Sequence, residues 1–157
     1  MTELRLAEFN AADPGRLQAL LSSCLAVPRW VGALLAGRPY ADRAALLTAA
    51  HLVLEPGEIH AAMAAHPRIG EKPASGHSRA EQSGVDDEAT ELFRTANAEY
   101  EARFDHVFLV CASGRGGEEL LADLRRRLGN DPDTELAIAG RELVKIATLR
   151  LEKAVLP

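Results

Sequence analysis

Proline and glycine divide this sequence into segments of helical length, and this division constrains the fold more than any other feature. Asp13-Pro14 is a helix N-cap followed by proline at the first helical position. Inside the later segments, apolar residues recur at three- and four-residue spacing. The expected helices begin at Pro14, cover 28–35, run from just after Tyr40 to Leu54, and then cover 56–66, 87–104, 118–128 and 134–155.

Strand patterning is nearly absent from the sequence. Residues 107–110, Val-Phe-Leu-Val, are the only plausible strand, and no internal repeat stands out. Strands that alternate with helices or follow one another would be needed for any β-containing class. The sequence therefore predicts an all-α fold, a helical bundle of roughly seven to eight helices that forms a single domain over residues 1–157.

Composition narrows the function classes. The chain has 157 residues, 47% of them hydrophobic, and a net charge of −5, which is typical of a globular domain that buries roughly two thirds of its unfolded surface. An acidic balance argues against nucleic acid as a partner, and the basic run 125–127 is interpreted as a solvated helical face. No segment suits a membrane span or a signal peptide, and the two cysteines form no redox motif. We therefore expect a soluble, cytoplasmic protein.

The most informative motif is His66-Pro67, followed closely by Ser78-x-x-Glu81-Gln82. Proline disfavours helical geometry in the residue before it, so the helix that begins at Pro56 should end near Ala65 or His66. At that end the helix dipole favours the imidazolium form, and such a histidine can exchange protons near neutral pH. The plainer alternatives are a simple helix stop at His66 and a capping box formed by Ser78 and Glu81.

Two helices carry polar residues where their patterns predict core. Arg150 falls in the apolar stripe of the last helix, one heptad after Leu143, and Asn97 lies beside the stripe of the 87–104 helix. An arginine in such a stripe either snorkels to the surface or is buried against an anion, which can be a protein carboxylate or a ligand. For Asn97 we favour a structural role, in which its side chain bonds a loop backbone.

Metal and nucleophile chemistry has weaker support. His51, His60 and His66 lack the four-residue spacing of two metal ligands on one helical face. Residues 113–117 lack the lysine of a phosphate-binding loop, and no nucleophile elbow supports a serine triad. A metal-dependent hydrolase that uses His60, His66 and a carboxylate stays open as a minor alternative.

Five motifs in order resemble one known family. They are His66-Pro67-Arg68-Ile69-Gly70, Ser78-x-x-Glu81-Gln82, Asn97-x-x-Tyr100-x-x-x-Phe104, Phe108-Leu109-Val110-Cys111-Ala112 and Leu149-Arg150-Leu151. Together they resemble the 2-oxo-4-hydroxy-4-carboxy-5-ureidoimidazoline (OHCU) decarboxylases, all-helical enzymes that complete urate breakdown to (S)-allantoin. The resemblance covers nearly the whole chain.

The resemblance assigns roles to residues of this chain. It implies His66 as the catalytic acid/base, with Glu81 and Arg150 as further catalytic residues. It also implies a set of substrate contacts: Pro67, Ser78, Glu81, Gln82, Phe108, Leu109, Val110, Cys111, Ala112 and Arg150. The implied partner is a small-molecule intermediate of purine degradation. No cofactor or metal is implied, and a homodimer is left open.

Two positions depart from the family pattern, and one alternative function stays open. The loop between Gly70 and Ser78 is short, and Asp105 stands where the family usually has glycine, so the entry of the chain into residues 108–112 is expected to differ. The alternative to an enzyme is a non-catalytic helical ligand-binding or interaction domain, in which Arg150 and Glu81 pair with each other.

Overall fold

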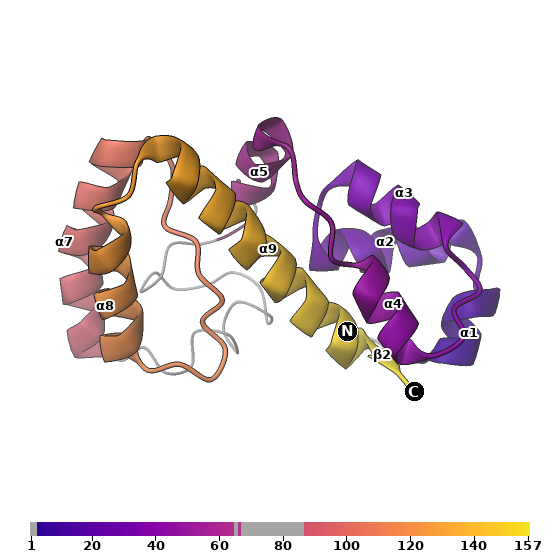
Figure 1. Ribbon diagram of the computed structural model, residues 1–157. Helices are drawn as coiled ribbons and strands as arrows, with labels where there is room; N and C mark the ends of the chain where they lie inside the picture. Colours follow the sequence, from indigo (N-terminus) through magenta and orange to yellow (C-terminus); the bar gives the residue numbers. More distant parts are fainter. Residues whose placement is uncertain (1–2, 65, 67–86) are drawn as a thin grey trace. The chain divides into compact units, whose positions relative to one another are not determined.

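The computed structural model describes residues 3–64, 66 and 87–157 (Figure 1). These residues contain eight helices and one pair of two-residue strands. The chain forms two compact units: unit 1 comprises Met1–Leu54 and Leu143–Pro157, and unit 2 comprises Glu55–Glu142. The last helix, α9 (Pro132–Ala154), contributes residues to both units. Within the described ranges, no helix is long and apolar enough to cross a membrane.

Unit 1 consists of four short helices, the C-terminal part of α9 and a small parallel strand pair. Its elements are β1 (Leu4–Arg5), α1 (Leu6–Ala11), α2 (Pro14–Cys24), α3 (Pro28–Ala36), α4 (Arg43–Ala49) and β2 (Val155–Leu156). Leu4 pairs with Val155 across the strands, so the first and last described segments of the chain lie side by side.

Local chemistry explains where the helices of unit 1 begin. The Asp13 carboxylate accepts a hydrogen bond from the Gly15 N–H at 3.0 Å, and Pro14 occupies the first turn, as the sequence predicts. Asp42 caps α4 by accepting from the Ala45 N–H at 2.8 Å. These caps fix helices of 11 and 7 residues, which are too short to be stable by propensity alone.

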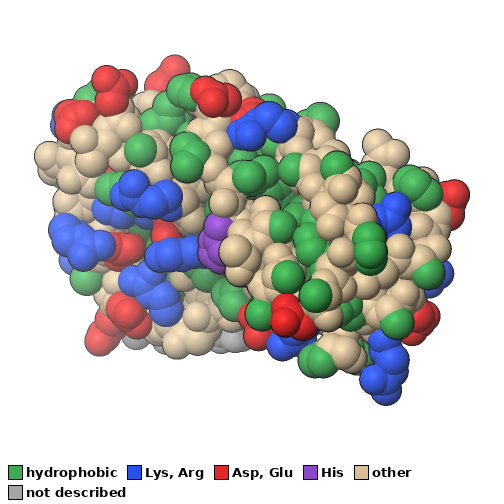
Figure 2. Space-filling model, turned by 45° about the vertical axis from the view of Figure 1, so that its right-hand side comes forward, with side chains coloured by type: hydrophobic (Ala, Val, Ile, Leu, Met, Phe, Trp, Pro, Cys, Tyr) green, Lys and Arg blue, Asp and Glu red, His purple; other side chains and the backbone are tan. Residues whose placement is uncertain are grey.

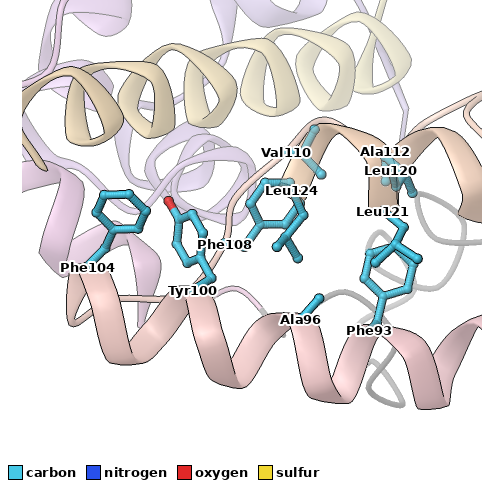
Figure 3. Close-up of a cluster of buried hydrophobic side chains, with 10 residues drawn as sticks. All are labelled: Phe93, Ala96, Tyr100, Phe104, Phe108, Val110, Ala112, Leu120, Leu121 and Leu124. Carbon is cyan, nitrogen blue, oxygen red and sulfur yellow. The ribbon is translucent and has the colours of Figure 1, made fainter. Parts of the chain in front are cut away.

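Unit 2 consists of α5 (Pro56–Met63), α7 (Asp87–Phe104), α8 (Gly117–Arg127) and the N-terminal part of α9. Side chains from α7, α8 and the intervening segment form its apolar cluster (Figure 3). The cluster consists of Phe93, Ala96, Tyr100, Phe104, Phe108, Val110, Ala112, Leu120, Leu121 and Leu124. The Tyr100 ring lies 4.7 Å from the Phe104 ring and 5.3 Å from the Phe108 ring, centroid to centroid.

The structure confirms the all-α class and most of the predicted helices, and it corrects two elements. The helix predicted to reach Leu54 ends at Ala49, and the Ala50 carbonyl instead accepts a hydrogen bond from the buried Trp30 Nε1 at 2.9 Å. Residues 107–110, the only plausible strand in the sequence, form neither strand nor helix. The sequence interpretation also missed α1 and the β1–β2 pair, which are too short to produce a periodic pattern.

Candidate active site

His66 follows α5 instead of lying within its last turn. The helix ends at Met63, with Ala64 as its C-cap, two to three residues before the predicted end. The His66 backbone N–H nevertheless donates to the Met63 carbonyl at 3.0 Å, so the residue stays attached to the end of the helix. The residue is partly exposed.

Four other predicted contacts lie outside the described residues. They are Pro67, Ser78, Glu81 and Gln82, and the short loop between Gly70 and Ser78 lies outside as well. The capping-box interpretation of Ser78 and Glu81 and the substrate-contacting interpretation therefore both stay predictions.

The segment 108–112 is an irregular stretch of backbone. It consists of Phe108, Leu109, Val110, Cys111 and Ala112, of which all but the partly exposed Cys111 are at most 3% exposed. The Leu109 carbonyl accepts from Arg127 Nη1 at 2.6 Å, and the Cys111 N–H donates to Glu142 Oε1 at 3.1 Å. A buried backbone without regular structure needs such partners, and here two charged side chains from two helices supply them.

Arg127 is itself held by a buried polar network. Its guanidinium bonds Glu135 through Nε at 2.6 Å and lies 4.5 Å from the centre of the Phe108 ring. Glu135 also accepts from the Tyr100 hydroxyl at 2.5 Å and from Asn130 Nδ2 at 3.0 Å. Burial, together with the hydrogen bond and charge of Glu135, raises the pKa of Tyr100, so this phenol stays protonated and donates.

This network corrects the interpretation of the basic run at 125–127. Arg125 and Arg126 are exposed, as expected for a solvated face, whereas Arg127 is 2% exposed. Acidic and basic side chains are interspersed on the face drawn in Figure 2. The missed signal is spacing: Arg127 lies seven residues after Leu120 and three after Leu124, on the apolar stripe of α8.

Arg150 is buried in unit 1, as its place in the apolar stripe predicts. It is 7% exposed, and its positive charge acts on the thiol of Cys24 in α2. Burial raises the pKa of Cys24 to about 11, while the Arg150 charge and a hydrogen bond from Ser23 oppose this rise. Of the two alternatives for Arg150, the structure shows burial instead of snorkelling, and the identity of its anionic partner stays a prediction.

The structure also bears on Asn97, on Asp105 and on the alternative of a metal site. Asn97 is 4% exposed, which confirms its predicted burial. Asp105 follows α7 directly and has a φ angle of +58°, a left-handed conformation that glycine adopts most easily. Among the described residues, no three His, Cys, Asp or Glu side chains are grouped to hold a metal ion.

The site residues are therefore distributed over both units. His66 and the segment 108–112 belong to unit 2, and Arg150 belongs to unit 1. Within unit 2, buried charges hold the irregular backbone of the segment 108–112. The model of one protein family, OHCU decarboxylase, matches residues 10–152 of this chain. The chain belongs to the OHCU decarboxylase family.

Two relatives match parts of the chain. The "Uric acid degradation bifunctional protein TTL" of Arabidopsis thaliana is 36% identical over 103 residues, which are 59% of this chain and 32% of that protein. The "2-oxo-4-hydroxy-4-carboxy-5-ureidoimidazoline decarboxylase" of Amia calva is 42% identical over 59 residues, which are 38% of this chain and 34% of that protein. The matches thus span about a third of the length of each relative.

Two solved structures share the fold. A crystal structure of OHCU decarboxylase in the presence of (S)-allantoin superposes with a TM-score of 0.70 at 28% identity, covering 84% of this chain and 94% of that one. A crystal structure of (S)-allantoin synthase has a TM-score of 0.74 at 17% identity, covering 97% of this chain and 54% of that one. At that identity the second structure supports the fold alone.

Proposed function

We propose that this protein decarboxylates OHCU to (S)-allantoin in urate degradation, without a cofactor. The observation that carries the proposal is the family match over residues 10–152, which includes all five motifs. The related structure with (S)-allantoin supports the same product. We further propose that residues 1–157 act as one catalytic domain in the cytoplasm.

The chemistry of the substrate explains why no cofactor is needed. OHCU carries a carboxylate on a hydroxyl-bearing ring carbon next to an imine. Breaking the carbon–carboxylate bond releases CO2, and the electron pair left behind is accepted by the imine. The substrate is thus its own electron sink, a role that a cofactor fills in many other decarboxylases. The protein has to orient the ring and protonate the intermediate on one face.

Each candidate residue has a role in this scheme. His66 is the acid/base, acting on the ring hydroxyl or protonating the intermediate. Glu81 and Gln82 hold ring and ureido N–H groups, and the segment 108–112 lines the site. Arg150 pairs with an anionic or carbonyl edge of the substrate, for which its buried position is suited.

The test is CO2 release from freshly generated products of urate oxidation, measured with and without a chelator. We expect release that survives chelation, and we expect His66→Asn to lower it by roughly 10²-fold or more, the usual scale for a general acid/base. His60→Asn is the matched control, since His60 is an exposed histidine of α5.

The other outcomes identify the alternatives. No release by the folded wild type would favour a non-catalytic ligand-binding domain. Activity that is lost on chelation, and lost equally in the His60→Asn and His66→Asn variants, would favour a metal-dependent hydrolase. Near-normal turnover of a folded His66→Asn variant would remove His66 from the mechanism.

A further inference from the structure

Charged side chains hold the backbone of the segment 108–112 at two points. The two hydrogen bonds to its backbone that involve charged side chains meet alternate residues, the Leu109 carbonyl and the Cys111 N–H. Val110, which is 3% exposed, lies between these two residues in sequence. Val110 forms no hydrogen bond through its N–H or C=O with any residue that the structure describes.

We propose that Arg127 and Glu142 are positioning residues, which fix this segment so that the backbone N–H and C=O groups of Val110 are presented to the ligand. The inference rests on the proposed function, because that function makes the segment a wall of the substrate site. Neither side chain is assigned a contact with the substrate. They act through the backbone that they hold.

The two positioning residues are suited to hold the backbone rigidly. Both are buried, Arg127 at 2% and Glu142 at 7% exposed, and both form charge-assisted hydrogen bonds, which are roughly twice as strong as neutral ones. Arg127 is fixed in turn by Glu135, which is fully buried and is bound by Tyr100. The segment is thus connected to α7, α8 and α9 of unit 2 through a continuous set of hydrogen bonds.

Rigid placement matters because the reaction depends on orientation. A displacement of about 1 Å in a substrate-holding element can cost on the order of 10²-fold in rate. An irregular segment has no ladder of its own to prevent such a displacement. The positioning residues supply what a strand would otherwise obtain from its neighbours.

The test compares Glu142→Ala with Glu142→Gln. Alanine removes the acceptor for the Cys111 N–H, whereas glutamine keeps an oxygen at the same position. We expect Glu142→Ala to accelerate hydrogen exchange at Cys111 and its neighbours in the ligand-free protein. We also expect it to raise KM and weaken (S)-allantoin binding by about 10-fold, and to lower kcat because the bound substrate is oriented less precisely. Glu142→Gln should restore all of these quantities toward wild type.

Glu152→Ala is the matched control, because Glu152 is a more exposed carboxylate of the same helix, paired with Arg43. Arg127→Lys gives an independent route, since it keeps the charge beside Glu135 but loses the guanidinium fork that reaches Leu109. It should accelerate exchange in the same segment and raise KM in the same way.

Two results would overturn the inference, and a third concerns the function instead. Unchanged exchange in folded Glu142→Ala would mean that the carboxylate does not hold the segment. Unchanged KM and (S)-allantoin affinity, or an equal loss in the alanine and glutamine variants, would mean that holding it does not position the ligand. A wild-type protein that neither turns over OHCU nor binds (S)-allantoin would refute the proposed function, and with it the ligand-positioning part of this inference. The hydrogen-exchange data would still test whether Arg127 and Glu142 hold the segment 108–112.

Discussion

The two units bury charge in different ways. Among the described residues, unit 2 buries Asp123, Arg127, Glu135 and Glu142, whereas unit 1 buries Arg150. In unit 2 the buried arginine and its carboxylate are connected to backbone, phenol and amide groups within hydrogen-bond distance. In unit 1 the charge of the buried Arg150 acts on the thiol of Cys24.

This difference separates two uses of a buried charge. A buried ion pair contributes little net stability compared with apolar packing, but removing one partner is strongly destabilising. The unit 2 network therefore determines the conformation of a segment that has no regular structure. The unit 1 arginine is the one to which the proposed function assigns a ligand.

The largest expected effect on stability is that of Arg127→Met in unit 2. This change leaves the fully buried Glu135 without its cation, so we expect a loss of about 3–5 kcal/mol in the free energy of unfolding, measured by urea titration. Arg125→Met, an exposed change in the same helix, should stay within about 0.5 kcal/mol of wild type. If Arg127→Met costs no more than its control, the network does not hold unit 2 together.

The matching change in unit 1 is Arg150→Met. If its proposed partner is the substrate, the ligand-free protein should lose less than about 1.5 kcal/mol, the range of volume-conserving core substitutions. Binding of (S)-allantoin should weaken by about 2–5 kcal/mol, as expected for a lost buried charge contact. Calorimetry and thermal unfolding without ligand measure the two effects. A stability loss as large as that of Arg127→Met would make the arginines of both units structural.

The sequence predicts the fold well where helices are long or sharply capped. The pattern of α7 matches its observed bounds, Asp87–Phe104, and the Asp13-Pro14 start is confirmed in detail. It fails where tertiary contacts decide: α4 ends at Ala49 because the following carbonyl binds Trp30, a partner 20 residues away in sequence. It also fails at 107–110, where β-branched and aromatic residues mark burial, not a strand.

The candidate site likewise has residues whose burial the sequence predicts and residues whose roles depend on tertiary contacts. Burial of Arg150 and Asn97 follows from helical periodicity, so it is predictable from the sequence. The roles of Arg127 and Glu142 are not, because each depends on a backbone group that another part of the chain brings close. A charged residue on an apolar stripe indicates burial, but it does not indicate the partner.

A third prediction concerns the pH dependence of the stability of unit 1. Burial raises the pKa of Cys24 from 9.0 to about 11 in the folded state. Below pH 9 the thiol is protonated in both states, and between pH 9 and 11 it ionises only in the unfolded chain. Stability should therefore fall as pH rises through this window, by about 2–3 kcal/mol in all.

Cys24→Ala isolates this contribution, since other groups titrate in the same range. The difference in unfolding free energy between wild type and Cys24→Ala should shrink from pH 8 to 11. Because the Arg150 charge lowers the pKa of Cys24 in the folded state, the Arg150→Met background should extend the loss to still higher pH and make it larger. A pH-independent difference would show that the thiol is not protected by burial.

The smallest predicted effect concerns the entry of the chain into the segment 108–112. Asp105 has a φ angle of +58°, which is unfavourable for most residues with a side chain and free of strain for glycine. We expect Asp105→Gly to stabilise unit 2 by about 0.5–1 kcal/mol and Asp105→Ala to destabilise it, measured by thermal unfolding. Gly114→Ala is the matched control: Gly114 has a φ angle of +76° and open space around its Cβ position, so it should lose a similar amount through backbone strain alone. If Asp105→Gly and Asp105→Ala were equally stable, the left-handed turn at Asp105 would contribute nothing to the conformation of the segment 108–112. The conformation of that segment would then depend on Arg127 and Glu142 alone.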